Sequence, residues 1–155
     1  MFFFVSLQAF RSIKLPKDNI MKKIILLVLI LISGANLSWS QIKFEKFDWA
    51  QLSEISAKEN KIIMIEMAAS WCHWCKVMEK KVFPKKEVGE FFNSNFLNAK
   101  LYDNEEAAEE FAKKYKVDTF PTFLFLDKDG KQIFRIDGAI TNAKEFISVA
   151  KNALK

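Results

Sequence analysis

The sequence predicts a single α/β domain with a mixed central sheet and helices on both of its faces. Residues 41–155 contain no internal repeat, low-complexity tract or linker rich in Pro and Gly, and their number is typical of one domain. Their apolar residues switch between the strand period and the helix period. The expected element order is β-α-β-α-β-α-β-β-α, in which a β-α-β half precedes a β-β-α half.

The first expected elements are an edge strand, a helix and a buried strand. Apolar residues alternate within residues 41–47, which is typical of a short edge strand. Asp48 is a suitable N-cap for a helix whose apolar residues follow at helical spacing. Residues 61–67 form a continuous apolar run with β-branched side chains, which predicts a strand buried on both faces.

The middle of the domain is expected to contain two helical regions and a strand. A helical stretch begins at about Cys72 and meets Pro84, and a second piece follows across residues 87–93. Residues 96–101 are then expected to form the next strand. Residues 105–115 predict a helix, because acidic residues at its start are favourable for the helix dipole.

The last part predicts a hairpin followed by a helix. Residues 122–126 form an apolar strand, and residues 127–130 form a tight turn in which Gly supplies a positive φ angle. Residues 131–136 are the expected hairpin partner. Asn142 is expected to cap a final helix with one apolar face.

Composition and charge exclude several classes of protein. Half of the 155 residues are hydrophobic, 28% are charged, and Gly and Pro total seven, which excludes a disordered, collagen-like or disulfide-scaffold chain. The formal charge of +5 is concentrated at the N-terminus: residues 1–40 contain five basic residues and one acidic residue, leaving 19 basic and 18 acidic residues in 41–155. Nucleic acid is therefore not an expected partner of the domain.

Residues 21–40 have the pattern of a secretory signal peptide. Two lysines precede nine uninterrupted apolar residues at 24–32, and small residues follow at the spacing that a signal peptidase recognises. A membrane anchor is the alternative, but it needs about 20 apolar residues. We expect cleavage after Ser40, with Ala35 as the second choice. The mature protein is then periplasmic or secreted.

Residues 1–20 fit poorly in front of such a signal. Their apolar start is interrupted by Arg11, Lys14 and Lys17. We expect translation to begin at Met21, so that residues 1–20 are an over-extended reading frame. A long basic region in front of the signal is the alternative.

The two cysteines of the chain lie close together, in the segment Trp71-Cys72-His73-Trp74-Cys75. A structural disulfide here would close a loop of four residues, which stabilises a fold by only about 2 kcal/mol. Zinc needs four N or S ligands, and the chain has a single histidine. We expect no metal, although a thiolate site assisted by methionines remains an alternative.

Redox chemistry fits this segment best. Cys72 is expected at the start of a helix, where unpaired backbone N–H groups and the helix dipole stabilise a thiolate. Cys75 follows one turn later on the same face and can resolve a mixed disulfide. His73 adds a nearby cation when it is protonated.

These residues resemble the thioredoxin superfamily, and the resemblance extends over residues 42–154. It rests on the motif Trp-Cys-His-Trp-Cys-Lys after a buried strand, together with further positions that match the family: Glu66, Lys100, Phe120-Pro121-Thr122, Gly130 and Gly138. The resemblance implies the thioredoxin fold. Within the superfamily the chain looks like single-domain secreted relatives, which resemble the C-terminal domain of membrane thiol–disulfide interchange proteins.

The resemblance also implies roles for two charged residues. Glu66 matches the buried acid of the family; burial would raise its pKa and suit it to accept the proton of Cys75. An acid that leans to the edge of the sheet is the alternative. Lys100 is either the partner of Glu66 or a lysine that points to solvent.

The remaining candidate residues concern substrate binding. The resemblance implies that Pro121 is cis and packed against the cysteine pair, with an ordinary edge proline as the alternative. Trp71 and Trp74 are expected to form an apolar rim for substrates together with His73 and Phe120; core packing is the alternative for the two tryptophans.

We therefore expect a thiol–disulfide oxidoreductase outside the cytoplasm that acts as a reductase through Cys72 and Cys75. No cofactor is expected, because the cysteines carry the electrons. The expected partners are protein disulfides and a membrane thiol–disulfide interchange protein as electron donor, with the chain itself a monomer. A disulfide oxidase or isomerase, a metal-handling protein and a non-catalytic binding module are the alternatives.

Overall fold

The computed structural model describes residue 23 and residues 41–155. The expectations for residues 1–20 and for the signal peptide at 21–40 therefore lie outside the described residues, apart from Lys23. No helix within the described part of the chain is long and apolar enough to cross a membrane.

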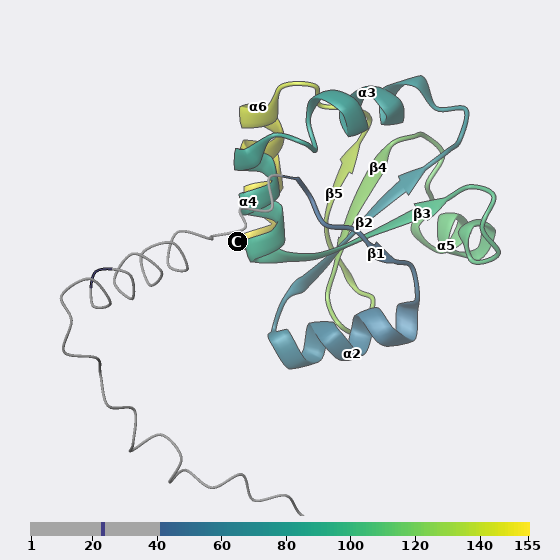
Figure 1. Ribbon diagram of the computed structural model, residues 1–155. Helices are drawn as coiled ribbons and strands as arrows, with labels where there is room; N and C mark the ends of the chain where they lie inside the picture. Colours follow the sequence, from purple (N-terminus) through teal and green to yellow (C-terminus); the bar gives the residue numbers. More distant parts are fainter. Residues whose placement is uncertain (1–22, 24–40) are drawn as a thin grey trace, which may run out of the picture. The chain divides into compact units, whose positions relative to one another are not determined.

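A five-stranded mixed sheet forms the centre of the domain, with the strand order β1-β3-β2-β4-β5 (Figure 1). β1 and β2 run parallel to β3, whereas β4 runs antiparallel to both β2 and β5. The predicted mixed sheet is confirmed. The strands are β1 (Glu45–Lys46), β2 (Ile62–Ala68), β3 (Phe96–Tyr102), β4 (Thr122–Leu126) and β5 (Gln132–Asp137).

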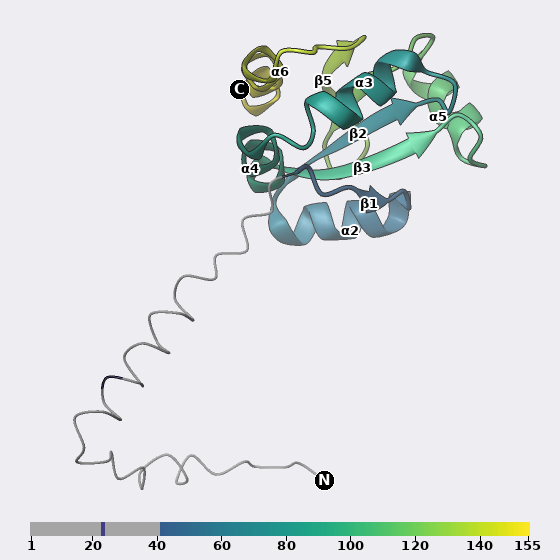
Figure 2. The same ribbon diagram turned by 45° about the horizontal axis from the view of Figure 1, so that its top comes forward.

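Helices cover both faces of this sheet, as predicted (Figure 2). One face packs against α2 (Trp49–Glu59) and α5 (Ala108–Tyr115). The other packs against α3 (His73–Lys81), α4 (Lys86–Asn95) and α6 (Ala143–Ala150), which continues into the short 3₁₀ helix η2 (Lys151–Leu154).

Each face of the sheet has its own apolar core. The α3, α4 and α6 side is dominated by stacked and edge-on phenylalanines, among them Phe92 and Phe146, whose ring centroids lie 4.7 Å apart. The α2 and α5 side is built mainly from aliphatic residues such as Leu52 and Ile65. Ile63 to Ala68 are all buried, so the prediction of a strand buried on both faces is confirmed for β2.

The predicted helix caps are also present. Asp48 accepts a hydrogen bond from the backbone N–H of Gln51 at 3.1 Å, and Asn142 does the same for Glu145 at 3.1 Å. Gly130 has a φ angle of 79° in the turn between β4 and β5, as predicted.

Two elements are shorter than the sequence predicts. β1 covers two residues of the expected 41–47, because the N–H groups of Ile42 and Lys43 donate to Phe83 and to the Asn93 side chain instead of to β3. α5 begins at Ala108 and not at Glu105, because the Glu105 side chain accepts from the N–H of Tyr102 and holds the preceding residues in turns.

Candidate active site at the start of α3

The cysteine motif lies where the central strand β2 leads into α3. After Ala68 the chain turns, and the N–H of Cys72 donates to the carbonyl of Ala69 at 3.0 Å. Cys72 is the N-cap of α3, and its Sγ accepts a hydrogen bond from the backbone N–H of Cys75 at 3.0 Å. The sulfur of Cys72 is thus held against the positive end of the helix dipole, an environment that stabilises a thiolate.

Cys72 and Cys75 are joined by a disulfide. Both are buried, but Cys72 keeps 5% of its surface exposed and Cys75 only 1%. They pack with Ala68 and Ala69 in a small cluster that Tyr102 and Phe120 cover. Of the two cysteines, Cys72 is therefore the more exposed.

Two exposed tryptophans flank Cys72. Trp71 is 69% exposed and Trp74 is 54% exposed, so neither is a core residue. The Trp71 indole N–H donates to Oδ2 of Asp103 at 2.9 Å, and its ring meets that of Phe120 edge-on at 5.8 Å. His73 packs edge-on against Trp74 at 5.4 Å. Large apolar side chains this exposed are typical of a binding surface.

The loop before β4 completes this surface. The peptide bond between Phe120 and Pro121 is cis, as predicted, and Phe120 packs on the cluster that holds both cysteines. The Pro121 carbonyl accepts from the N–H of Gly138 at 2.8 Å, and Thr122 Oγ1 donates to the carbonyl of Thr119 at 2.9 Å. The loop is fixed by its own backbone and by the end of β5.

Glu66 is completely buried in β2, on the face that α3 covers. Burial raises its pKa to about 7, although the positive charge of Lys100 opposes the shift. Lys100 Nζ lies 3.0 Å from Glu66 Oε2, but neither carboxylate oxygen receives a hydrogen bond of good geometry from the described residues. Glu66 therefore does not lean to the edge of the sheet, and Lys100 does not point to solvent.

A second acid shares Lys100. Glu79, one turn after Cys75 in α3, has its Oε1 2.5 Å from Lys100 Nζ and also accepts from the Tyr102 hydroxyl at 3.2 Å. Burial by itself would lower the pKa of Lys100, but the carboxylates of Glu66 and Glu79 raise it above its usual value. For Tyr102, whose charged form is an anion, burial raises the pKa.

A pocket of about 380 Å³ lies between Glu79 and Cys75. Cys75, Glu79 and Tyr102 all line it. Within residues 23 and 41–155, no group of three or more His, Cys, Asp or Glu side chains is placed to hold a metal ion.

Three residues of this site have no role predicted from the sequence: Glu79, Tyr102 and Asp103. The position of Glu79 carried a usable signal, because a residue four positions after Cys75 returns to the same helix face. Tyr102 ends β3 two residues after Lys100, and Asp103 is the next residue. Their contacts depend on how that strand end meets the cysteine loop, which no local pattern reveals.

A disulfide at a helix start, a cis-proline loop beside it and a buried acid beneath the same helix define a redox-active protein of the thioredoxin type. The sequence agrees: residues 50–154 match the family described as a thioredoxin-like domain. The chain belongs to this family.

Curated relatives and solved structures of this type resemble the chain. The disulfide bond reductase DsbH of Chlamydia pneumoniae is 27% identical over 80% of this chain and 76% of the relative. The thiol:disulfide interchange protein DsbD of Pseudoalteromonas atlantica is 32% identical over 69% of this chain, but the match spans only 18% of DsbD. A candidate disulphide-isomerase of Bacteroides thetaiotaomicron superposes with a TM-score of 0.68 at 28% identity, covering 75% of this chain and 95% of that structure.

The oxidised C-terminal domain of DsbD from Neisseria meningitidis has the same fold, with a TM-score of 0.57 at 20% identity over 67% of this chain and 90% of that domain. Together with the Cys72–Cys75 disulfide, these relatives identify the chain as a thioredoxin-like thiol–disulfide oxidoreductase.

Proposed function

We propose that this chain is a reductase of protein disulfides outside the cytoplasm, with Cys72 as the attacking cysteine and Cys75 as the resolving cysteine. The observation that carries this proposal is the placing of Cys72: it caps α3, is the more exposed cysteine of the pair and lies between two exposed tryptophans. A thiolate at that position is both stabilised and accessible.

In the first step the reduced chain attacks a substrate. The Cys72 thiolate attacks one sulfur of a substrate disulfide, a bond forms between Cys72 and that sulfur, and the second substrate sulfur leaves as a thiolate. Trp71, Trp74, His73 and Phe120 contact the substrate segment around its disulfide. The backbone beside Pro121 pairs with that segment as a short added strand.

In the second step Cys75 resolves the mixed disulfide. The Cys75 thiol gives its proton to Glu66, the buried acid on the sheet face beneath α3, and attacks the sulfur of Cys72. The Cys72–Cys75 disulfide forms, and the remaining substrate sulfur leaves as a thiolate. Two electrons pass from the chain to the substrate. The positive charge of Lys100 stabilises the carboxylate of Glu66 within the sheet.

A donor must then reduce the Cys72–Cys75 disulfide. We assign this step to a membrane thiol–disulfide interchange protein that carries a dithiol of its own, and we assign the chain itself to the monomeric state. The signal-like pattern of residues 21–40 supports a location outside the cytoplasm, with residues 41–155 as the mature domain. Peptide mapping of the secreted protein tests this division: a mature protein that contains residues 11–17 would refute it.

A disulfide isomerase is the second candidate, because one of the similar structures is that of a candidate disulphide-isomerase. The redox potential separates the two functions. Thioredoxin has a reduction potential of about −270 mV, and protein disulfide isomerase has one of about −180 mV. Equilibration with a thiol–disulfide buffer of known poise, followed by quantification of oxidised and reduced chain, gives this potential.

We expect a value closer to that of thioredoxin, together with rapid reduction of a model disulfide protein. A potential near that of the isomerases, with rescue of a scrambled protein instead of simple reduction, would assign the chain to the second candidate. The dipeptide between the cysteines is His-Trp, which differs from that of thioredoxin and of the disulfide isomerases. The potential of this chain therefore has to be measured.

A further inference from the structure

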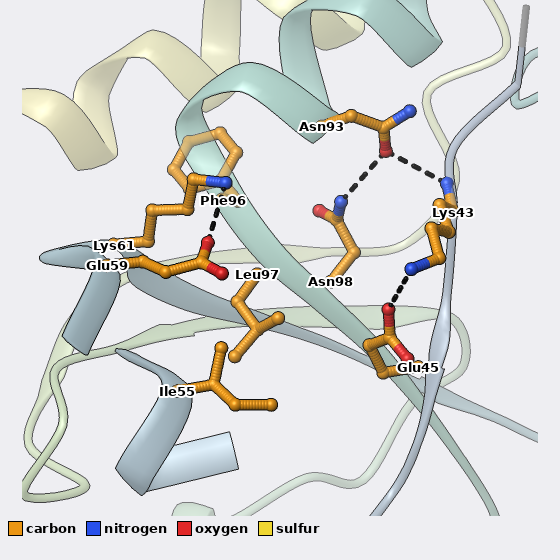
Figure 3. A pocket seen from close by; sticks show the side chains of 9 residues that line it. All are labelled: Lys43, Glu45, Ile55, Glu59, Lys61, Asn93, Phe96, Leu97 and Asn98. Atoms are coloured by element: carbon orange, nitrogen blue, oxygen red, sulfur yellow. Dashed lines mark hydrogen bonds and ion pairs between the residues drawn. The ribbon is translucent and has the colours of Figure 1, made fainter. Parts of the chain in front are cut away.

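A second polar pocket lies at the start of β3, and none of the residues that line it belongs to the redox site. One wall is the C-terminal half of α2 and the other is the segment 43–45 (Figure 3). Its volume is about 280 Å³. Pockets for drug-sized ligands hold about 300–1,000 Å³, so this pocket suits a smaller molecule.

The orientation of one amide in this pocket is fixed by the backbone. Asn93 Nδ2 donates to the carbonyl of Gln41 at 3.0 Å, and Asn93 Oδ1 accepts from the N–H of Lys43 at 2.9 Å. Because a carbonyl only accepts and an N–H only donates, the Asn93 amide has one possible orientation. Asn98 must therefore present its Nδ2 to Asn93 Oδ1, which it does at 3.3 Å.

The carbonyl oxygen of Asn98 then faces away from Asn93 into the pocket, as Figure 3 shows. Asn98 is only 3% exposed, and this oxygen has no hydrogen-bond partner among the described residues. A buried acceptor without a partner costs about 1–3 kcal/mol. The pocket thus contains a buried acceptor that a ligand donor can satisfy.

Two ion pairs stand on opposite sides of this acceptor (Figure 3). Lys61 pairs with Glu59 at 3.0 Å on one side, and Lys43 pairs with Glu45 at 2.6 Å on the other. All four side chains are at least 30% exposed, so their charges can be rearranged at little cost. Each side offers one cation and one anion, which favours a ligand that carries both charges.

The remaining contacts are apolar. Ile55, Phe96 and Leu97 line the pocket below and beside the charged groups. A short aliphatic group of a ligand would cover these side chains and remove apolar surface from water.

We propose that this pocket binds a small zwitterion with an aliphatic side group, of the class of free α-amino acids. The ligand ammonium donates to Asn98 Oδ1 and pairs with the carboxylates at the rim. The ligand carboxylate pairs with Lys43 and Lys61, and the aliphatic group packs on Ile55 and Leu97. Binding does not involve the cysteines and is independent of their redox state.

Titration of the purified chain with L-leucine, followed through the NMR signals of the Asn98 side-chain amide, tests this proposal. N-acetyl-leucine lacks the ammonium and leucinamide lacks the carboxylate. We expect saturable shifts with leucine and at least tenfold weaker binding of both analogues, and tenfold corresponds to about 1.4 kcal/mol. The leucine affinity should be equal for the oxidised and the reduced chain.

Two variants separate binding from folding. Asn98→Leu removes the acceptor and should weaken leucine binding at least tenfold, whereas the exposed control Asn152→Leu should not. If Asn98→Leu does not fold, the double variant K43Q/K61Q serves instead, because both side chains are at least 30% exposed. It should weaken leucine binding and leave leucinamide binding unchanged. The absence of a saturable shift with leucine, or equal binding of all three compounds, would overturn the proposal. The Asn98 side-chain oxygen would then be hydrogen-bonded by water instead.

Discussion

The ammonium of Lys100 lies 3.0 Å from the fully buried carboxylate of Glu66, its direct neighbour in the parallel register of β2 and β3. This pairing places an ionisable acid in the middle of the sheet, where an isolated charge is costly. Lys100 is itself shared with the more exposed Glu79, so its charge only partly compensates for the burial of Glu66.

The raised pKa of Glu66 predicts a specific pH dependence of stability. The pKa of Glu66 is about 7 in the folded chain against an ordinary value of 4.5, so the folded state binds this proton more tightly than the unfolded state. The free energy of unfolding therefore falls as the pH rises from about 4.5 to about 7 and then levels off. The full effect is about 3 kcal/mol.

Glu66→Gln removes this titration. Chemical denaturation of the disulfide form between pH 5 and pH 8 should show the variant gaining stability relative to the wild type as the pH rises. The control Glu106→Gln, at an exposed position, should follow the wild type. A constant difference between Glu66→Gln and wild type across this range would contradict the assigned pKa.

The capping position of Cys72 predicts unequal reactivity of the two thiols after reduction. Cys72 should be alkylated first by iodoacetamide, with a pKa below the value of about 8.5 for a free cysteine, because helix N–H groups and the dipole favour its thiolate. Alkylation rates between pH 5 and pH 10, with peptide mapping of the product, measure both quantities. Faster alkylation of Cys75 would reverse the proposed roles.

Asp103 should act on protein substrates through Trp71. Its carboxylate accepts the Trp71 indole N–H, so Asp103→Ala frees the ring and should lower kcat/KM for a protein disulfide about fivefold, the equivalent of about 1 kcal/mol. Asp103→Asn keeps an oxygen acceptor and should restore most of the activity.

Two comparisons make this test specific. Turnover of a small disulfide such as oxidised glutathione should be unchanged in Asp103→Ala, because it needs little of the tryptophan surface. The exposed turn variant Asp129→Ala should behave as wild type. An equal loss with both substrates would show that Asp103 acts on the cysteines and not on docking.

Gly89 in α4 allows the segment before β1 to lie against the helix. A Cβ atom at this position would be 2.7 to 2.8 Å from backbone atoms of Gln41, which cannot swing aside as a side-chain end can. Gly89→Ala should therefore lower the free energy of unfolding by about 1–3 kcal/mol, although alanine is intrinsically the better helix former. Denaturant melts measure the change. Ser148→Ala in α6 is the exposed control, and a stabilised Gly89→Ala would disprove the close packing.

The fold was largely predictable because its signals are local. The apolar run of β2, the caps Asp48 and Asn142 and the turn at Gly130 each depend on a few neighbouring residues, and the structure confirms all four. The two short elements, β1 and α5, differ because side chains of Asn93 and Glu105 compete for backbone N–H groups.

The site was predictable only in part. The cysteine motif can be recognised from the spacing of its two cysteines. The resemblance to the thioredoxin superfamily pointed to Glu66, Lys100 and Pro121. The sharing of Lys100 by Glu66 and Glu79 could not be predicted, because it depends on how α3 lies over β3. The unpaired oxygen of Asn98 was equally hidden, since it follows from contacts with a segment more than fifty residues away in sequence.

Trapping of a reaction intermediate tests the central claim most directly. Cys75→Ala should stop exchange after the first step, so that the reduced variant accumulates a mixed disulfide with a protein substrate, visible on a non-reducing gel and mapped to Cys72 by mass spectrometry. Cys72→Ala, with its remaining sulfur at the more buried position, should trap little or nothing. Equal trapping by the two variants, or none by Cys75→Ala, would contradict the proposal that Cys72 attacks and Cys75 resolves.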